Sequence, residues 1–168
     1  MAARGEQDAI QLLTDDHRRV EQLFKEFENA RDEAGKEEFA RRICTELKVH
    51  SMLEEEILYP ALRGKIEDAD LDEALVEHDG AKLLINEIEA GSAGDSFFEA
   101  KVKVLKEQIE HHIEEEESEK NNIFAQARAT DVDLDALADR MVARKAELMR
   151  VAGTHGLPPA TTATMETV

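Results

Sequence analysis

Apolar residues recur at steps of three and four along most of the chain, which is the period of an amphipathic helix. The first stripe lies between about Glu6 and Arg31 and consists of Ile10, Leu13, Val20, Phe24 and Phe27. Four further stripes predict helices that end near Tyr59, run from about Ala69 to Ala90, begin near Asp95 or Ser96, and run from Asp131 or Asp133 to about Val151. Short loops between long helices favour antiparallel neighbours, so the sequence predicts an all-α, up-down-up-down four-helix bundle with an additional C-terminal helix.

Breaks in this pattern define the expected boundaries. Pro60 lacks a backbone N–H, so the second helix is expected to end or kink near it, and Gly91 is a suitable C-cap for the third. The bundle is expected to occupy residues 1–153. Residues 154–168 are rich in Thr, Ala and Pro and are expected to form a disordered tail.

Six polar residues fall on the apolar stripes. They are His17, His50, Glu54, His78, His112 and Glu116. His50 and Glu54 are four residues apart, as are His112 and Glu116, so each pair projects from one face of its helix. A buried carboxylate is costly unless it is paired or bound to a metal. A cation shared by these side chains would remove that cost.

The chain also repeats itself at a step of 61 to 62 residues. His17 aligns with His78, and His50 and Glu54 align with His112 and Glu116. A bundle of two such helix pairs has an approximate two-fold axis, which would bring all six side chains to one level. The alternative is that the pairs are solvated or merely hydrogen-bonded, and one His-x-x-x-Glu pair alone would not distinguish the two.

The six donors predict a site for two metal ions. Imidazole and carboxylate together suit iron, manganese or zinc. Six ligands are too many for one tetrahedral zinc, whereas two metals are bound in bundle cores by inward-facing helical side chains of this sort.

The order of these residues resembles the hemerythrin family, in particular its HHE cation-binding branch. The segment HSMLEEEILYPAL is similar to the family's second-helix signature, and EHHIEEEE followed by IFAQAR is similar to its fourth. The resemblance covers about residues 8–128, and the fifth predicted helix resembles an extension that many members carry. It implies two non-haem iron ions, bridged by carboxylates and by an oxo or hydroxo group.

Two departures from the family pattern matter. The oxygen carriers have a second histidine one turn after the third-helix histidine, where this chain has Lys82. The coordination position that this histidine fills would stay open, hold water or be approached by the Lys82 amine, unless the Lys82 side chain extends out of the stripe.

The second departure lies in the fourth helix, which is interrupted by Lys120, Asn121 and Asn122. This insertion predicts a bulge or break near Asn121 and leaves the packing of Ile123 and Phe124 open.

Several other residues could contribute. His111 could replace His112 as a ligand by pairing with Glu115, although the repeat favours His112. Tyr59 could donate a hydrogen bond or an electron near the site, or simply pack. Cys44 is expected to be a small buried apolar residue. The remaining acidic residues near the site are expected to form solvated faces or to add one ligand; they are Glu55, Glu56, Glu114, Glu115, Glu117 and Glu119.

Charge and composition narrow the function classes. The 168 residues carry a net charge of −18, which repels phosphate backbones and anionic membranes and attracts cations. One cysteine allows no intrachain disulfide and no thiolate metal cluster. With no signal peptide and no membrane span evident, a cytoplasmic protein without nucleic acid or membrane partners is expected, and its oligomeric state is left open.

Four functions compete. The first is a non-haem di-iron protein that binds or senses oxygen or a related small ligand such as nitric oxide or peroxide. The second is a di-iron oxidoreductase, peroxidase- or oxidase-like, which the missing fifth histidine favours. Iron storage rests only on the acidic surface. A metal-free structural bundle would leave two buried carboxylates without partners.

Overall fold

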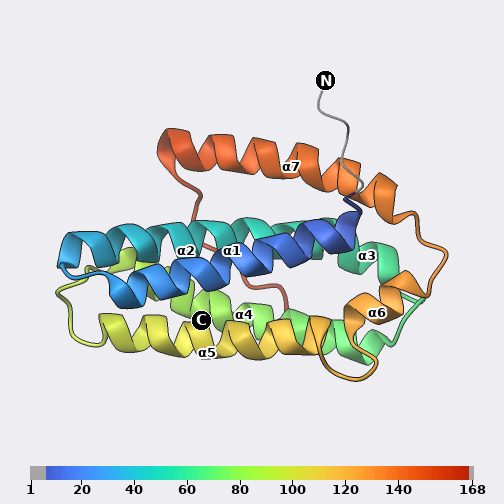
Figure 1. Ribbon diagram of the computed structural model, residues 1–168, viewed down its shortest axis with the longest axis horizontal. Helices are drawn as coiled ribbons and strands as arrows, with labels where there is room; N and C mark the ends of the chain where they lie inside the picture. Colours follow the sequence, from blue (N-terminus) through green and yellow to red (C-terminus); the bar gives the residue numbers. More distant parts are fainter. Residues whose placement is uncertain (1–6, 167–168) are drawn as a thin grey trace.

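The protein is a bundle of antiparallel helices in the computed structural model, which describes residues 7–166 (Figure 1). The elements are α1 (Ala9–Asn29), α2 (Glu33–Leu53), a π-helical turn η1 (Glu54–Leu58), α3 (Tyr59–Leu62), α4 (Asp68–Ala90), α5 (Phe98–Glu117), α6 (Ile123–Arg128) and α7 (Leu134–His155). Residues 7–166 contain no strand. The predicted all-α architecture is confirmed: α1, α2, α4 and α5 form an up-down-up-down bundle, and α7 packs outside it against α1 and α2.

Acidic and amide side chains set the starts of several helices. Asp8 accepts a hydrogen bond from the Gln11 N–H at the start of α1, and Asp133 caps α7 in the same way. These caps satisfy backbone donors that have no partner inside the helix. Gly91 is the C-cap of α4, as its position in the sequence predicts.

The core consists of two apolar clusters, one toward each end of the bundle. The first gathers residues from the ends of the helices near α3, α6 and α7, including Leu13, Leu53 and Met141. The second lies toward the α1–α2 and α4–α5 loops and includes Phe24 and Leu105. The polar stripe residues fall between the two clusters, so a polar layer is enclosed by apolar packing on both sides.

The second helix continues beyond its expected end. The π turn η1 follows α2 directly, and the helix ends at Leu62 rather than near Tyr59. In the π turn the Tyr59 N–H bonds to the Glu54 carbonyl, five residues back. Pro60 lies in the first turn of α3, a position where its missing N–H is tolerated.

The break predicted in the fourth helix is present. Helix α5 ends at Glu117, and Asn121 has a φ of 59°, a left-handed conformation that asparagine tolerates better than most residues. Helix α6 then starts at Ile123, with Asn122 as its N-cap. Ile123 and Phe124 are both buried, so the insertion does not disrupt their packing.

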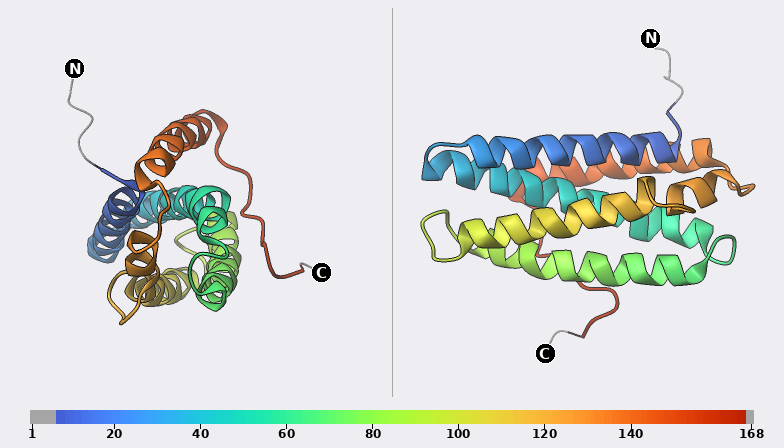
Figure 2. Two further views of the ribbon diagram at one scale, coloured as in Figure 1. Left: turned by 90° about the vertical axis from the view of Figure 1, so that its right-hand side faces the viewer. Right: turned by 60° about the horizontal axis from the view of Figure 1, so that its bottom comes forward.

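The tail is where the structure departs most from the sequence-based expectation. Residues 154 and 155 belong to α7, and residues 157–166, here called the C-terminal strap, run back along the bundle against α2 and α4 (Figure 2). The prediction of disorder is therefore wrong for residues 154–166, while residues 167 and 168 lie outside the described chain. Composition misled because hydrogen bonds to buried side chains hold most of the strap, and only Leu157 at its start packs against the apolar core within the described residues.

None of the helices in the described part of the chain is long and apolar enough to cross a membrane.

Candidate metal centre

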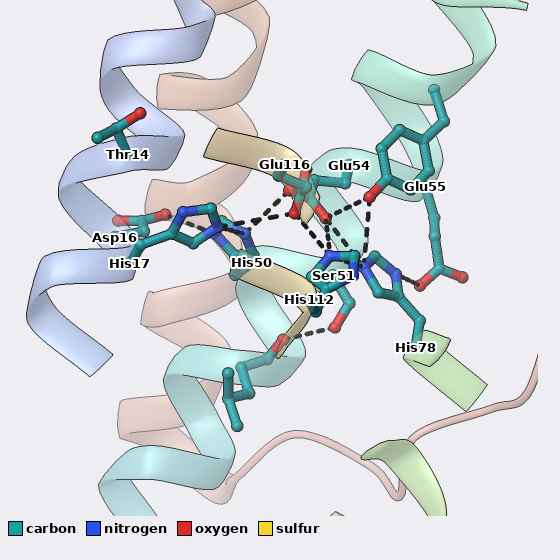
Figure 3. Close-up of polar contacts among 12 residues, drawn as sticks. Thr14, Asp16, His17, His50, Ser51, Glu54, Glu55, His78, His112 and Glu116 are labelled. Atoms are coloured by element: carbon teal, nitrogen blue, oxygen red, sulfur yellow. Dashed lines mark hydrogen bonds and ion pairs between the residues drawn. The ribbon is translucent and has the colours of Figure 1, made fainter. Parts of the chain in front are cut away.

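The four predicted histidines meet as two pairs in the polar layer (Figure 3). The Nε2 atoms of His17 and His50 lie 3.1 Å apart, and those of His78 and His112 lie 3.1 Å apart. All four side chains are buried. Each comes from a different bundle helix, so the site depends on the packing of all four.

The two glutamates lie between the histidine pairs. Glu54 places Oε1 3.0 Å from Nε2 of His50 and Oε2 3.0 Å from Nε2 of His78, so its carboxylate spans both pairs. Glu116 places Oε1 2.6 Å from Nε2 of His112. Both glutamate side chains are fully buried. The structure thus brings together all six residues that the sequence singles out.

Several buried carboxylate oxygens in this cluster lack hydrogen-bond partners within the described part of the chain. Oε1 of Glu54 and both carboxylate oxygens of Glu116 are buried and accept no hydrogen bond within residues 7–166. An unpartnered buried carboxylate oxygen is costly, and a cation would satisfy it. The atoms fall into two overlapping groups with metal-ligand spacing: one is His17, His50, Glu54 and Glu116, and the other is Glu54, His78 and His112.

An outer ring of carboxylates faces the other nitrogen of each histidine. The Nδ1 contacts are His17 with Glu117 at 3.0 Å, His50 with Asp16 at 3.4 Å, His78 with Glu55 at 3.0 Å and His112 with Glu77 at 3.4 Å. A carboxylate at Nδ1 favours the tautomer that carries its proton there, which leaves the Nε2 lone pair free. When both rings of a pair are neutral, their two lone pairs face each other, an arrangement that suits a cation.

Cationic side chains hold three of these outer carboxylates in turn. Lys82 contacts Glu55, Lys145 of α7 contacts Asp16, and Arg18 contacts Glu117. Each contact fixes the carboxylate that orients a histidine ring. The centre therefore includes groups well beyond the six inner residues, and α7 contributes to it directly.

Sequence reasoning missed this outer ring. Glu55 and Glu117 were expected on solvated faces, which is wrong, since both lie against histidines. A signal was present: Asp16 and Glu77 each precede a site histidine, and Glu55 and Glu117 each follow a site glutamate. In the internal repeat Asp16 aligns with Glu77 and Glu55 aligns with Glu117, so acidic residues recur at equivalent positions beside the site.

Lys82 and His111 do not join the inner cluster. The Lys82 amine lies 2.8 Å from Oε1 of Glu55 and 3.0 Å from the carbonyl oxygen of Thr161, so it supports an outer carboxylate. His111 is exposed and pairs with Glu115 at 3.0 Å. Of these two neighbouring histidines, His112 is the one that lies in the inner cluster, at the position that the internal repeat favours. Cys44 is buried, as expected, and burial raises the pKa of its thiol to about 12.

Tyr59 contacts the centre directly. Its hydroxyl donates a 2.9 Å hydrogen bond to Oε2 of Glu54 and lies 3.5 Å from Nε2 of His78. The π turn explains the contact, because its wider turn brings residues five apart toward one face. Burial, followed by the negative charges of Glu116 and Glu54, raises the pKa of Tyr59 well above its usual range, so the phenol stays protonated.

The Tyr59→Phe variant is expected to unfold more easily in the metal-free state. It loses a buried hydrogen bond to a charged group, which typically contributes about 1.5–3 kcal/mol to the free energy of unfolding. Denaturant unfolding monitored by circular dichroism would measure the change, with the unchanged slope of the transition as the control for an intact fold. An unaltered midpoint would contradict the contact between the phenol and Glu54.

The raised pKa values of three inner histidines favour protons on the cluster when no metal is bound. Burial alone would lower the pKa of His50, but the negative charge of Glu54 and the hydrogen bond to Asp16 raise it to about 10. The pKa values of His78 and His112 are raised as well, against the effect of burial, by neighbouring glutamates. Burial would raise the pKa of Glu54, but the histidines around it hold that pKa well below its usual range. A metal ion would displace these protons and take over their charge compensation.

The comparisons with known proteins agree with this geometry. Residues 8–120 match the Hemerythrin HHE cation binding domain. The chain belongs to this family. All six inner residues lie within the matched segment, and so do the four outer carboxylates. The HHE match ends before α6, α7 and the C-terminal strap.

Two individual relatives extend the comparison. A crystal structure of a hemerythrin HHE cation binding domain-containing protein from Mycobacterium kansasii shares the fold, with a TM-score of 0.72 and 21% identity over 90% of this chain and 95% of that one. A protein named DNA nickase from Nostoc sp. is 32% identical over 122 residues, which cover 73% of this chain and 33% of that protein. This HHE chain therefore spans about a third of the length of that relative.

Proposed function

We propose that this HHE protein binds two iron ions and uses them to bind or sense a small ligand such as oxygen, nitric oxide or peroxide. His17, His50, Glu54 and Glu116 would hold one ion, and His78, His112 and the two glutamates the other. Glu54 would bridge the ions, since its two oxygens reach different histidine pairs. The donor set of imidazoles and carboxylates suits iron, which supplies reversible redox and ligand-binding chemistry when bound.

The observation that carries the small-ligand proposal is a cavity beside the histidines. It measures about 30 Å³ and is lined by the four histidines, by Asp16 and Ser51, and by apolar side chains, namely Val20, Leu47, Ala81, Ile85, Ile109 and Ile113. A space of this size holds roughly one or two water-sized groups. It fits a diatomic molecule or peroxide and excludes larger organic substrates.

The chain's own residues define how a ligand would be received. The apolar wall limits water around the inner nitrogens, and the outer carboxylates keep each imidazole oriented. Tyr59 presents a buried O–H at Glu54 and is the proton-bearing group of the site that stays neutral. The outer carboxylates thus orient the imidazoles, and the Tyr59 hydroxyl holds a proton next to Glu54.

A di-iron oxidoreductase is the second candidate, and Tyr59 is the observation that favours it. Its phenol touches a carboxylate that would bridge the metals, a position from which it could supply a proton or an electron. Steady-state turnover with peroxide or oxygen would distinguish this activity from binding alone. A protein that only binds would change its spectrum without continued consumption.

DNA is not part of the proposal. The Nostoc relative is named for its action on DNA, but this chain spans only a third of it. The net charge of −18 opposes binding to a phosphate backbone.

The metal content tests the proposal. The purified protein, reconstituted anaerobically with ferrous iron, is expected to hold about two irons per chain and, once oxidised, to show a near-ultraviolet charge-transfer band that bleaches on reduction. Exposure of the reduced sample to oxygen, nitric oxide or peroxide would then separate binding from turnover. Many more than two irons per chain would indicate storage, and no bound iron would overturn the proposal.

A further inference from the structure

The C-terminal strap is docked by specific hydrogen bonds to four buried or half-buried residues of α2 and α4, namely Lys48, Asp79, Lys82 and Asn86. Asn86 pairs its side-chain amide with both the N–H and the C=O of Ala160, at 2.8 and 2.9 Å. Asp79, whose side chain is fully buried, accepts from the backbone N–H groups of Ala163, Thr164 and Met165 and from the Thr164 hydroxyl, at distances between 2.6 and 3.0 Å. Lys48 donates to the carbonyl of Pro158 at 2.9 Å. Such a set of bonds gives the strap one defined register on the bundle.

Lys82 connects the strap to the bundle interior. The residue is 7% exposed, and its amine donates to the carbonyl oxygen of Thr161 at 3.0 Å, to Glu55 at 2.8 Å and to Asp79 at 3.5 Å. Each of the three donors of the ammonium group thus has an acceptor. One of these acceptors belongs to the strap and another to η1.

Glu55 continues the connection to the metal centre. Its Oε1 accepts from Lys82, and its Oε2 lies 3.0 Å from Nδ1 of His78. The opposite nitrogen of that ring, Nε2, faces Glu54 and His112 in the inner cluster. An unbroken chain of hydrogen bonds therefore runs from the strap through Lys82 and Glu55 to an inner histidine.

We propose that Lys82 is a positioning residue for the metal centre, and that through it strap docking and metal binding stabilise each other. This inference rests on the proposed metal function. His78 would hold a metal ion through Nε2, and its Nδ1–H would then point to Glu55 and keep that carboxylate in the orientation in which it accepts from Lys82. The two equilibria are linked thermodynamically. If metal binding increases the docking constant of the strap by some factor, strap docking increases the metal affinity by the same factor.

The strap also lines a cavity of about 230 Å³ beside this chain of bonds. Its walls include Ser51 and Glu55 from the bundle and residues 158–161 from the strap.

The test uses Co²⁺ as the probe metal and hydrogen exchange of the strap amides as the readout. In the wild-type protein, Co²⁺ is expected to slow exchange at Ala163, Thr164 and Met165. Lys82→Met keeps the apolar stem but removes the donors, so it is expected to lower Co²⁺ affinity by about 10-fold, as loss of an outer partner of a metal ligand typically does. In this variant Co²⁺ should no longer change exchange of the strap, and Lys82→Arg should restore part of both effects.

Lys145→Met is the matched control. Lys145 holds Asp16 against His50, so it occupies the equivalent place on the other histidine pair without contacting the strap. The variant should also lose Co²⁺ affinity, yet Co²⁺ should still slow strap exchange. Equal behaviour of the two variants would overturn the assignment to Lys82.

A second variant covers the case in which Lys82→Met detaches the strap altogether. Asn86→Ala removes both bonds to Ala160 without touching Glu55, and it is expected to speed strap exchange and lower Co²⁺ affinity together. Faster exchange with unchanged affinity would overturn the coupling while leaving the metal centre intact. Failure of the wild-type protein to bind Co²⁺ would overturn the metal centre and the coupling together.

Discussion

The Glu54→Gln variant is expected to lose both metal ions. Glu54 is the residue common to both groups of metal-spaced atoms, and its two oxygens each lie 3.0 Å from a histidine of a different pair. Glutamine matches the shape but removes the charge and replaces one acceptor with a donor. Loss of outer partners alone costs about 10- to 100-fold in metal affinity, so loss of this inner carboxylate should exceed about 100-fold.

Metal analysis after anaerobic reconstitution would measure the effect, with Glu56→Gln as the matched control. Glu56 lies two residues away in the same π turn, but its side chain is exposed and pairs with Arg144. That variant should bind iron as the wild-type protein does. Retention of one full equivalent of iron by Glu54→Gln would show that the two ions do not share this carboxylate.

The Phe124→Ala variant is expected to be the most destabilised of the variants considered. Phe124 is 4% exposed, and its ring stacks on His17 with centroids 5.7 Å apart and planes inclined by 4°. Removing a buried phenylalanine typically costs about 3–5 kcal/mol in the free energy of unfolding. The cavity would also free the His17 ring, so bound metal should pass to a chelator more quickly.

Phe97→Ala provides the comparison for this prediction. Phe97 is 77% exposed and lies in the loop before α5, so its truncation should change the unfolding midpoint little. Thermal or denaturant unfolding of both metal-free variants would measure the difference. Similar midpoints would mean that α6 contributes little to the core, despite the burial of Phe124.

Sequence periodicity predicted the bundle well because every long helix buries one stripe. The spacing of His50 and Glu54, repeated at His112 and Glu116, placed the inner cluster correctly, since helical geometry alone fixes residues four apart on one face. The break near Asn121 was also predictable, because three inserted residues rotate the apolar stripe away from the core.

The features that escaped prediction depend on contacts between elements. Whether Glu55 faces water or His78 is decided by the distance between η1 and α4, which no local pattern encodes. The strap is rich in Thr, Ala and Pro and lacks periodicity, so its composition indicates disorder. Its order comes from Asp79 and Asn86, residues of α4 that lie more than seventy positions away in the sequence.

The crossed pattern of outer carboxylates has a consequence for how the protein is assembled during synthesis. His17 on α1 contacts Glu117 at the end of α5, and His78 on α4 contacts Glu55 on η1, so each helical hairpin supplies the outer carboxylate for one histidine of the other. The first hairpin to leave the ribosome contains His17, His50 and Glu54, with His50 already facing Asp16, but it lacks Glu116 and the Glu117 partner of His17. A nascent chain should be unable to retain a metal until residue 117 has emerged and the two hairpins have docked. Metal capture would then mark the end of folding rather than its start.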